Sequence, residues 1–291
     1  MPSLALKTGE MKVLITGLTG QLGHETAGVL RIRGTPFLGV GSAELDITDR
    51  KQVLRLITDC HPDAVIHCAA YTQVDRAEDD VERCMRVNVE GTRNIAEACR
   101  AVGAKMLYVS TEYVFPGTGE MPWETDDPTG PLNVYGKSKL EGELAVKELL
   151  DRLFIVRTSW LIGEHGNNFV KTMLRLAEEH RTLRVVEDQI GSPTFTADLA
   201  PLLCEMIETE KYGVYHATNE GFCSWAELAE AVFRLSGKAV SVEHVSTEEY
   251  AAKAIRPTNS RLSKRSLDEN GFARLPEWKR SLGIMLTGNK D

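Results

Sequence analysis

The chain has 291 residues, 42% of them hydrophobic, and its 34 Lys and Arg against 42 Asp and Glu give a net charge of −8. A chain of this length can bury a sizeable core without disulfide or metal support. The acidic balance and the lack of a basic stripe argue against nucleic-acid binding. No run approaches the ~18 apolar residues that span a bilayer, so no membrane partner is expected.

The six cysteines form no Cys-x-x-Cys pair and no cluster with zinc-ligand spacing. We therefore expect reduced thiols, most of them buried as small apolar residues, and a cytoplasmic location. Residues 1–10 hold one basic residue, Lys7, and an apolar stretch too short for a signal peptide. We interpret them as an N-terminal extension outside the fold.

Short apolar runs alternate with helical patterns over the first half of the chain. In chain order, the patterns predict a strand at 12–16, a helix at 21–31, a strand at 35–40, a helix at 49–60, a strand at 64–68, a helix at 80–102, a strand at 105–110, a helix at 134–149 and a strand at 153–157. Strands that are apolar on both faces and alternate with helices form parallel sheets covered on both sides. Right-handed crossovers then predict an α/β fold with a Rossmann-type doubly wound parallel sheet.

The remainder of the chain is less regular. It predicts a helix at 168–180, a strand at 183–186, a helix opened by a capping box at 224–227, a strand at 240–245 and a short helix from Pro276. Glycine and proline punctuation indicates that the chain leaves the sheet and returns. We predict a dinucleotide-binding domain at 11–157, with returning segments at about 183–216 and 261–291. A smaller, discontinuous substrate lobe is predicted at 158–182 and 217–260.

A glycine-rich turn, GLTGQLG at 17–23, follows the first strand directly and opens the first helix. Glycines at Gly17, Gly20 and Gly23 let the backbone turn sharply and approach a pyrophosphate. The helix N-terminus then offers N–H groups and partial positive charge to that anion. An ordinary turn with incidental glycines is the alternative, but the strand–turn–helix context favours dinucleotide binding.

The end of the second strand bears on the choice of cofactor. NAD sites place an acid there to hold the ribose 2′-OH, whereas this chain has glycine, valine, glycine and serine at 39–42 and no acid until Glu44. This favours NADP mildly, because no arginine stands there to bind a phosphate either. Asp46 and Ile47 follow and could flank the adenine, or Asp46 could simply start the next helix.

Tyr135 and Lys139 stand four residues apart on the helix after the fourth strand, on one helical face. A neighbouring ammonium lowers a tyrosine pKa, and such a tyrosine can move the proton on an alcohol or carbonyl oxygen while hydride moves at carbon. Ser110 or Thr111, at the end of the fourth strand, can hydrogen-bond the substrate oxygen or cap the turn. Together these residues predict a redox site.

Three further positions follow strand ends or lie near them. Small residues at 68–70 would let the backbone approach the cofactor, and Asn88 in the following helix could be structural. Trp160, after the fifth strand, could stack on a base or sugar or belong to the core.

Several segments carry a resemblance to a known family. They are GLTGQLG at 17–23, LDIT at 45–48, CAAYTQVDRAE at 68–78, NVEGTRN at 88–94, STEYVFPG at 110–117, NVYGKSKLEGE at 133–143, VRTSWLIG at 156–163, NNFVKTML at 167–174, DQIGSPTFTADLA at 188–200 and RPTNSRLS at 256–263. From Met11 to about Leu286 the chain resembles the extended short-chain dehydrogenase/reductase family and, within it, the dTDP-4-dehydrorhamnose reductase family.

The resemblance implies an oxidoreductase that uses NADPH, or NADH, to reduce the C4 ketone of dTDP-4-dehydro-L-rhamnose to dTDP-L-rhamnose for polysaccharide biosynthesis. It implies that Tyr135 donates the proton, that Lys139 holds the nicotinamide ribose, and that Thr111 binds the reacting oxygen. The implied cofactor-binding residues are Gly17, Gly20, Gln21, Leu22, Gly23, Asp46, Ile47, Ala69, Ala70, Thr72, Tyr135 and Lys139. The implied substrate-binding residues are Val74, Asp75, Thr111, Glu112, Tyr113, Trp160 and Arg256.

The chain departs from the family at Glu112, where aspartate is usual, so the carboxylate is displaced by about one carbon–carbon bond, which bears on the substrate or its pose. Some members bind magnesium at a dimer contact. Glu25 could serve that role, but Ala197 stands where a second acid is expected, and we predict no metal. The resemblance also implies a homodimer.

Two alternatives remain open. The first is a sugar-nucleotide epimerase or dehydratase of the same fold; a dehydratase needs an acid–base pair, but Glu112 is followed by Tyr113. The second is a non-catalytic subunit resembling the regulatory subunit of methionine adenosyltransferase, against which Tyr135 and Lys139 argue.

Overall fold

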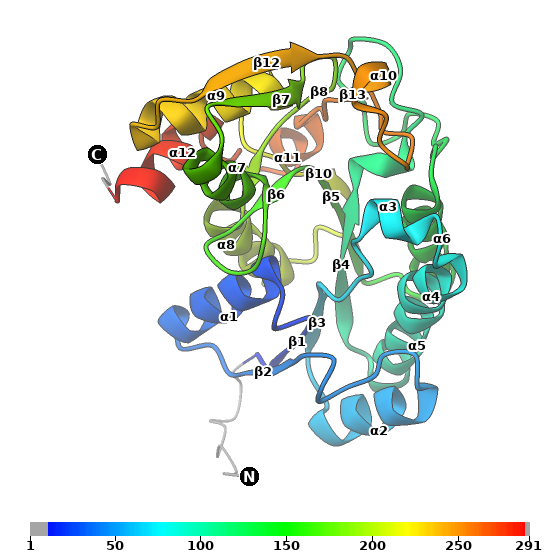
Figure 1. The fold of residues 1–291 in the computed structure, drawn as a ribbon. Coiled ribbons are helices and arrows are strands. Elements are labelled where there is room, and N and C mark those ends of the chain that lie inside the picture. The colour runs from blue at the N-terminus through cyan, green and yellow to red at the C-terminus, as the bar shows by residue number, and fades with distance from the viewer. Residues whose placement is uncertain (1–10, 289–291) are drawn as a thin grey trace.

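The computed structural model describes residues 11–288 and is built on a six-stranded, wholly parallel sheet (Figure 1). The strand order is β10-β5-β4-β3-β1-β2. Their bounds are β1 Val13–Thr16, β2 Phe37–Val40, β3 Ala64–His67, β4 Lys105–Thr111, β5 Leu153–Thr158 and β10 Gly213–His216. The order reverses between β1 and β3, so the predicted doubly wound Rossmann-type fold is confirmed. The predicted extension at 1–10 lies outside the described residues.

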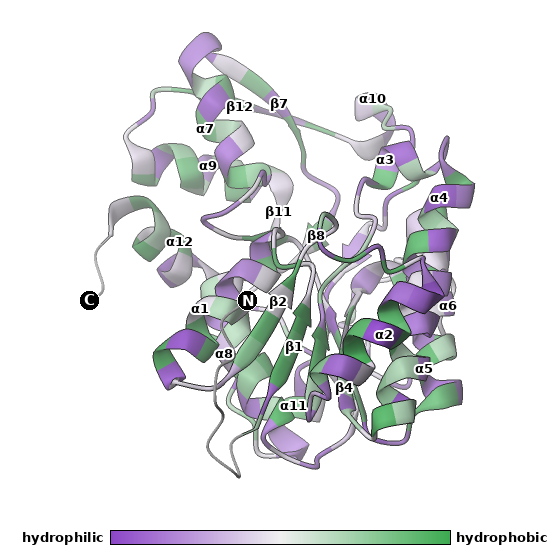
Figure 2. Cartoon of the chain, turned by 90° about the horizontal axis from the view of Figure 1, so that it is seen from below, coloured by the Kyte–Doolittle hydropathy of each residue, from purple (hydrophilic) through white to green (hydrophobic). Residues whose placement is uncertain are grey.

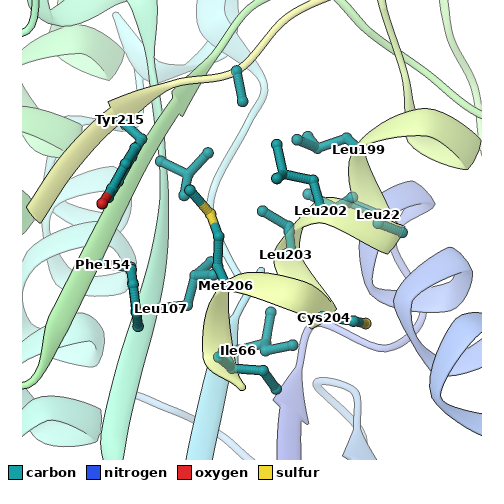
Figure 3. Close-up of a cluster of buried hydrophobic side chains, with 14 of the residues drawn as sticks. Leu22, Ile66, Leu107, Phe154, Leu199, Leu202, Leu203, Cys204, Met206 and Tyr215 are labelled. Carbon is teal, nitrogen blue, oxygen red and sulfur yellow. The ribbon is translucent and has the colours of Figure 1, made fainter. Parts of the chain in front are cut away.

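Helices cover both faces of this sheet (Figure 1). α1 (Gln21–Arg33) and α8 (Thr196–Ile207) pack on one face, and α2 (Arg50–Cys60), α5 (Thr92–Val102) and α6 (Val134–Leu149) pack on the other. Figure 3 shows the first core, in which side chains of α8 meet strand residues such as Leu107 and Phe154. Figure 2 shows hydrophobic strands between helices of mixed hydropathy, as burial on both sheet faces requires.

A short helix, α3 (Val74–Ala77), follows β3. The helical pattern predicted over 80–102 is confirmed from Val81 to Val102, where α4 (Val81–Met85) and α5 are joined by a π-helical turn, η1 (Arg86–Gly91). The wider turn carries buried Asn88, whose Oδ1 accepts from Tyr71 N at 2.7 Å and whose Nδ2 donates to Ser138 Oγ at 2.8 Å. Asn88 therefore ties the loop after β3 to α6, the structural role that its sequence position allowed.

A second, smaller core lies beyond the sheet. It joins α7 (Phe169–Glu179), α9 (Trp225–Ser236) and α12 (Trp278–Thr287), and Ser224 caps α9 through the predicted capping box. β7 (Thr182–Val186) pairs in parallel with β12 (Ser241–Val245). β12 lies in the predicted substrate lobe, and the division of the chain into two domains stays a prediction.

Short elements complete the chain: η2 (Glu112–Val114), β6 (Leu161–Ile162), β8 (Ile190–Gly191), β9 (Thr194–Phe195), β11 (Cys223–Ser224), α10 (Thr247–Tyr250), β13 (Asn259–Ser260) and α11 (Arg265–Glu269). Four of the six cysteines are buried and two are half-buried. Within residues 11–288, no helix is both long enough and apolar enough to cross a bilayer.

A buried ion pair fixes α6 against the sheet. Arg157 on β5 donates to Glu143 on α6 from Nε at 2.9 Å and from Nη2 at 2.8 Å, and both side chains are almost fully enclosed. Ser110 on β4 donates to the same carboxylate at 2.6 Å. Glycines let α6 come this close, because a Cβ at Gly142 would lie 2.4 Å from the Tyr108 hydroxyl oxygen.

We expect Arg157→Met to lower the free energy of unfolding by about 3–5 kcal/mol, because it leaves the Glu143 carboxylate buried without its partner. Urea unfolding followed by circular dichroism measures the change. The double variant Glu143→Leu/Arg157→Met removes both charges and should recover most of the loss. Arg93→Met, which breaks an exposed pair with Glu148, should cost less than about 1 kcal/mol. If Arg157→Met were as stable as Arg93→Met, the buried pair would not stabilise the fold as proposed.

Candidate active site

A cleft of about 940 Å³ opens at the carboxyl edge of the central sheet. Its walls come from the ends of β1, β2, β3, β4 and β5, from the glycine-rich turn and from α6. Small-molecule sites span roughly 300–1,000 Å³, so this cleft is at the large end of the range. It lies where parallel α/β sheets bind their ligands.

All the residues predicted to bind the cofactor line this cleft: Gly17, Gly20, Gln21, Leu22, Gly23, Asp46, Ile47, Ala69, Ala70, Thr72, Tyr135 and Lys139. Gly17 has φ +75°, and a Cβ there would lie 2.6 Å from Ala69 N, so only glycine lets the turn sit against the chain after β3. No side chain caps the N-terminus of α1, and its first turn holds no acid. That helix end therefore suits an anionic phosphate, and the residues fit a dinucleotide.

Lys139 is held in place by the strand beside it. Its Nζ donates to Val109 O at 2.7 Å and lies 4.0 Å from the centroid of the Tyr108 ring. Burial lowers the pKa of Lys139 to about 7, against a smaller opposing effect of Glu143. The ammonium is thus positioned by a backbone carbonyl and an aromatic face, one helical turn beyond Tyr135.

Tyr135 differs from the expectation that Lys139 lowers its pKa. Burial raises the pKa of the Tyr135 phenol, the Glu112 carboxyl raises it further, and a hydrogen bond with Thr111 only partly offsets them. The predicted lowering is therefore wrong for this structure, because the Lys139 ammonium is directed at Val109 O. A phenol is protonated at neutral pH with or without this shift, so Tyr135 is in the form that a proton donor needs, while the raised pKa makes it a weaker acid until a ligand changes its surroundings.

The two hydroxyls at the end of β4 have separate partners. Ser110 donates to Glu143, as described above, whereas Thr111 Oγ1 donates to Glu112 Oε2 at 2.7 Å. Glu112 is only 4% exposed. Burial raises the pKa of Glu112 to about 7, although the Thr111 bond acts in the opposite sense. Thr111, Glu112 and Tyr135 thus form one enclosed polar group in the cleft.

The residues predicted to bind substrate divide into two groups. Val74, Thr111, Glu112, Tyr113 and Trp160 line the cleft. Asp75 and Arg256 do not; they pair with each other, with Arg256 Nη2 to Asp75 Oδ2 at 2.6 Å and Nη1 to Oδ1 at 3.0 Å. The Arg256 hydrogen bonds hold the pKa of the Asp75 carboxyl below its usual range.

Trp160 stacks on a residue that sequence reasoning missed. Its ring lies 3.6 Å from that of Trp225, centroid to centroid, at 15° between planes, and both rings line the cleft. Trp160 also adopts φ +48°, a left-handed conformation that is rare for a bulky residue and is found most often at functional sites. Trp225 directly follows Ser224, which caps α9. In the sequence it therefore looks like the first residue of a helix and not like a residue of the cleft.

Two arginines, Arg83 on α4 and Arg86 on η1, were also missed, and both line the cleft. Their helical spacing resembles that of any solvated face. Glu25 lies elsewhere, with Ala197 and Asp198 in a separate small pocket. Asp198 there accepts hydrogen bonds from Asn219 and Ser281.

The raised pKa of Glu112 predicts an unusual dependence of the free energy of unfolding on pH. Between pH 4.5 and about 7 the native Glu112 keeps its proton while the unfolded chain loses it, so this group reduces stability as pH rises and has a constant effect above pH 7. The full change is about 3 kcal/mol.

Glu112→Gln should abolish that trend, so the variant gains stability relative to the parent chain between pH 5 and 7.5. Urea unfolding across this range measures the difference. Exposed Glu120 provides the control, since Glu120→Gln should leave the pH trend unchanged. A constant offset between Glu112→Gln and the parent chain would show that Glu112 is ionised throughout.

Comparison with known proteins identifies relatives over nearly the whole chain. The RmlD substrate binding domain family matches residues 11–290. The dTDP-4-dehydrorhamnose reductase of Streptomyces griseus is 44% identical over 276 residues, which cover 92% of this chain and 91% of that protein.

Solved structures agree. The dTDP-4-dehydrorhamnose reductase of Bacillus anthracis, crystallised in complex with NADP, is 43% identical with a TM-score of 0.94, covering 96% of this chain and 100% of the other. An orthologue from Clostridium acetobutylicum is 42% identical with a TM-score of 0.92, covering 94% of this chain and 97% of the other. By fold, cleft and sequence the chain therefore belongs to the RmlD substrate binding domain family, within which these similar proteins are dTDP-4-dehydrorhamnose reductases.

Proposed function

We propose that the protein reduces the C4 ketone of dTDP-4-dehydro-L-rhamnose to dTDP-L-rhamnose, using NADPH or NADH. The single observation that carries this proposal is the placement of Tyr135, Lys139 and Thr111 in the same cleft as the glycine-rich turn. Similar proteins, among them that of Streptomyces griseus, are named dTDP-4-dehydrorhamnose reductase, and the one from Bacillus anthracis was crystallised with NADP.

Bound NADPH would supply the hydride that adds to C4. The chain would supply the matching proton from the half-buried Tyr135 phenol, which is protonated at neutral pH. Thr111 would hydrogen-bond the carbonyl oxygen and so hold it within reach of the phenol. Lys139, fixed by Val109 O, would hold the nicotinamide ribose. One hydride and one proton convert the ketone to the alcohol, so the reaction balances.

The sugar nucleotide would occupy the end of the cleft lined by Val74, Tyr113 and Trp160. Its diphosphate carries negative charge, and Arg256 stands beside Tyr113 on this side, where its charge acts against the rise that burial imposes on the Tyr113 pKa. Arg256 and Asp75 are proposed to contact the substrate after their mutual ion pair rearranges. The homodimer and the cytoplasmic location stay predictions.

We expect Tyr135→Phe to lower kcat by about 10²–10⁴-fold, because the phenol is the proposed proton donor. The assay follows absorbance of the reduced nicotinamide, with the keto sugar made in situ by the two preceding enzymes. An unchanged urea unfolding curve for the variant separates lost chemistry from lost folding. Retention of full activity in the variant would exclude Tyr135 as the donor.

The reductase also differs from an epimerase in how it treats its cofactor. An epimerase keeps NAD through its cycle, whereas a reductase releases oxidised cofactor after each turnover. We therefore expect the purified protein to carry little bound nicotinamide, measured by absorbance after denaturation. A stoichiometric load of NAD would favour the epimerase reading over the reductase.

A further inference from the structure

The side chain of Glu44 places a carboxylate at the end of β2, although Glu44 lies four residues beyond that strand. In dinucleotide-binding domains this place decides between two cofactors: an acid accepts hydrogen bonds from the adenosine ribose of NAD, whereas the 2′-phosphate of NADP needs donors or positive charge. β2 ends at Val40, followed by Gly41 and Ser42, so no side chain there carries charge.

Glu44 turns back to fill this place. Its Oε2 accepts a hydrogen bond from Gly41 N at 2.8 Å, while Glu44 N donates to Gly41 O at 3.2 Å. A Cβ placed on Gly41 would lie 3.1 Å from Glu44 Oε2. The Glu44 carboxylate therefore lies within van der Waals reach of the point from which an acidic side chain at residue 41 would extend.

The carboxylate also adjoins the predicted cofactor cleft. Thr19, Gly41 and Ser42 line that cleft, and the same Cβ on Gly41 would lie 2.9 Å from Thr19 Cγ2. The glycine-rich turn is joined to the strand end, since Leu18 N donates to Val40 O at 3.1 Å. Glu44 is solvent-exposed, and no ion pair within residues 11–288 neutralises it. Its negative charge thus stands next to the pyrophosphate-binding turn.

We propose that Glu44 determines how the protein discriminates between NADH and NADPH. Its carboxylate accepts hydrogen bonds from the adenosine ribose hydroxyls of NADH. Toward NADPH it acts as a competing anion, because it occupies the Gly41 N–H that a 2′-phosphate would use and repels that phosphate. This inference rests on the dinucleotide site of the proposed function and adds the residue that sets its specificity.

The exposed side chain would also let one site serve both cofactors. Glu44 is attached through a three-bond stem rather than fixed in the strand, so it can rotate outward and release Gly41 N–H to a phosphate. The cost of that rotation falls on NADPH alone. Removing the charge should therefore strengthen NADPH binding and weaken NADH binding, in opposite directions.

The test compares Glu44→Gln with the parent chain. Glutamine keeps the length of the side chain and an oxygen that can accept from Gly41 N–H, so the turn is preserved while the charge is lost. Dissociation constants for NADPH and NADH are measured on the free enzyme by quenching of tryptophan fluorescence, independently of turnover. We expect the constant for NADPH to fall by about tenfold, equivalent to roughly 1.4 kcal/mol, and that for NADH to rise.

Asp59→Asn is the matched control, because it removes one charge from an exposed position on α2, where the carboxylate pairs with Arg55. It should leave the ratio of the two constants unchanged. Raising the salt concentration should shrink the NADPH gain of Glu44→Gln, since the repulsion is screened.

Equal changes in both constants, or no change, would overturn the inference and reduce Glu44 to a turn residue. If the parent chain bound neither cofactor, the proposed function itself would fail. That outcome is distinct, because it appears before any variant is compared.

Discussion

The enclosed ion pair between Glu143 and Arg157 is the constraint on which the cleft depends. It joins α6 to β5, and the Ser110 bond extends it to β4. Tyr135, Lys139 and Glu143 follow each other at four-residue spacing, so one face of α6 carries all three. Because a buried pair gains little net free energy after desolvation, its main effect here is geometric: it sets the rotation of α6 and hence the direction of the phenol.

Burial also shifts the pKa values of the titratable side chains in the cleft. The same enclosure raises the pKa of the Tyr135 phenol and brings the pKa values of Glu112 and Lys139 to about 7. Each shift has the sign expected when a charged form is removed from water. Burial therefore favours the uncharged forms of the Glu112 carboxyl and the Lys139 amine, while the Tyr135 phenol stays uncharged, as it would be in solution.

The sequence predicts the local parts of this arrangement and not the distant ones. The glycine-rich turn and the Tyr135–Lys139 pair are contiguous patterns tied to a strand or a helix, so spacing alone identifies them. The ion pair of Glu143 with Arg157 and the stack of Trp160 on Trp225 depend on which segments meet in space. α8 is apolar on nearly every face and contains Pro201, so it lacks the periodicity that reveals an amphipathic helix. The π-helical turn at Arg86–Gly91 widens the helix locally, but its residues resemble those of an ordinary α-helix, so the sequence does not reveal it.

The stacked indoles of Trp160 and Trp225 have a consequence for the shape of the ligand. One ring follows β5 at the sheet edge and the other opens α9 in the smaller core, so the pair spans the two halves of the molecule. Flat rings at 3.6 Å leave no room for a third ring between them. A planar ligand group can therefore contact the pair only through a ring edge or through an outer ring face. The pair thus restricts the shapes of ligand that fit this part of the cleft.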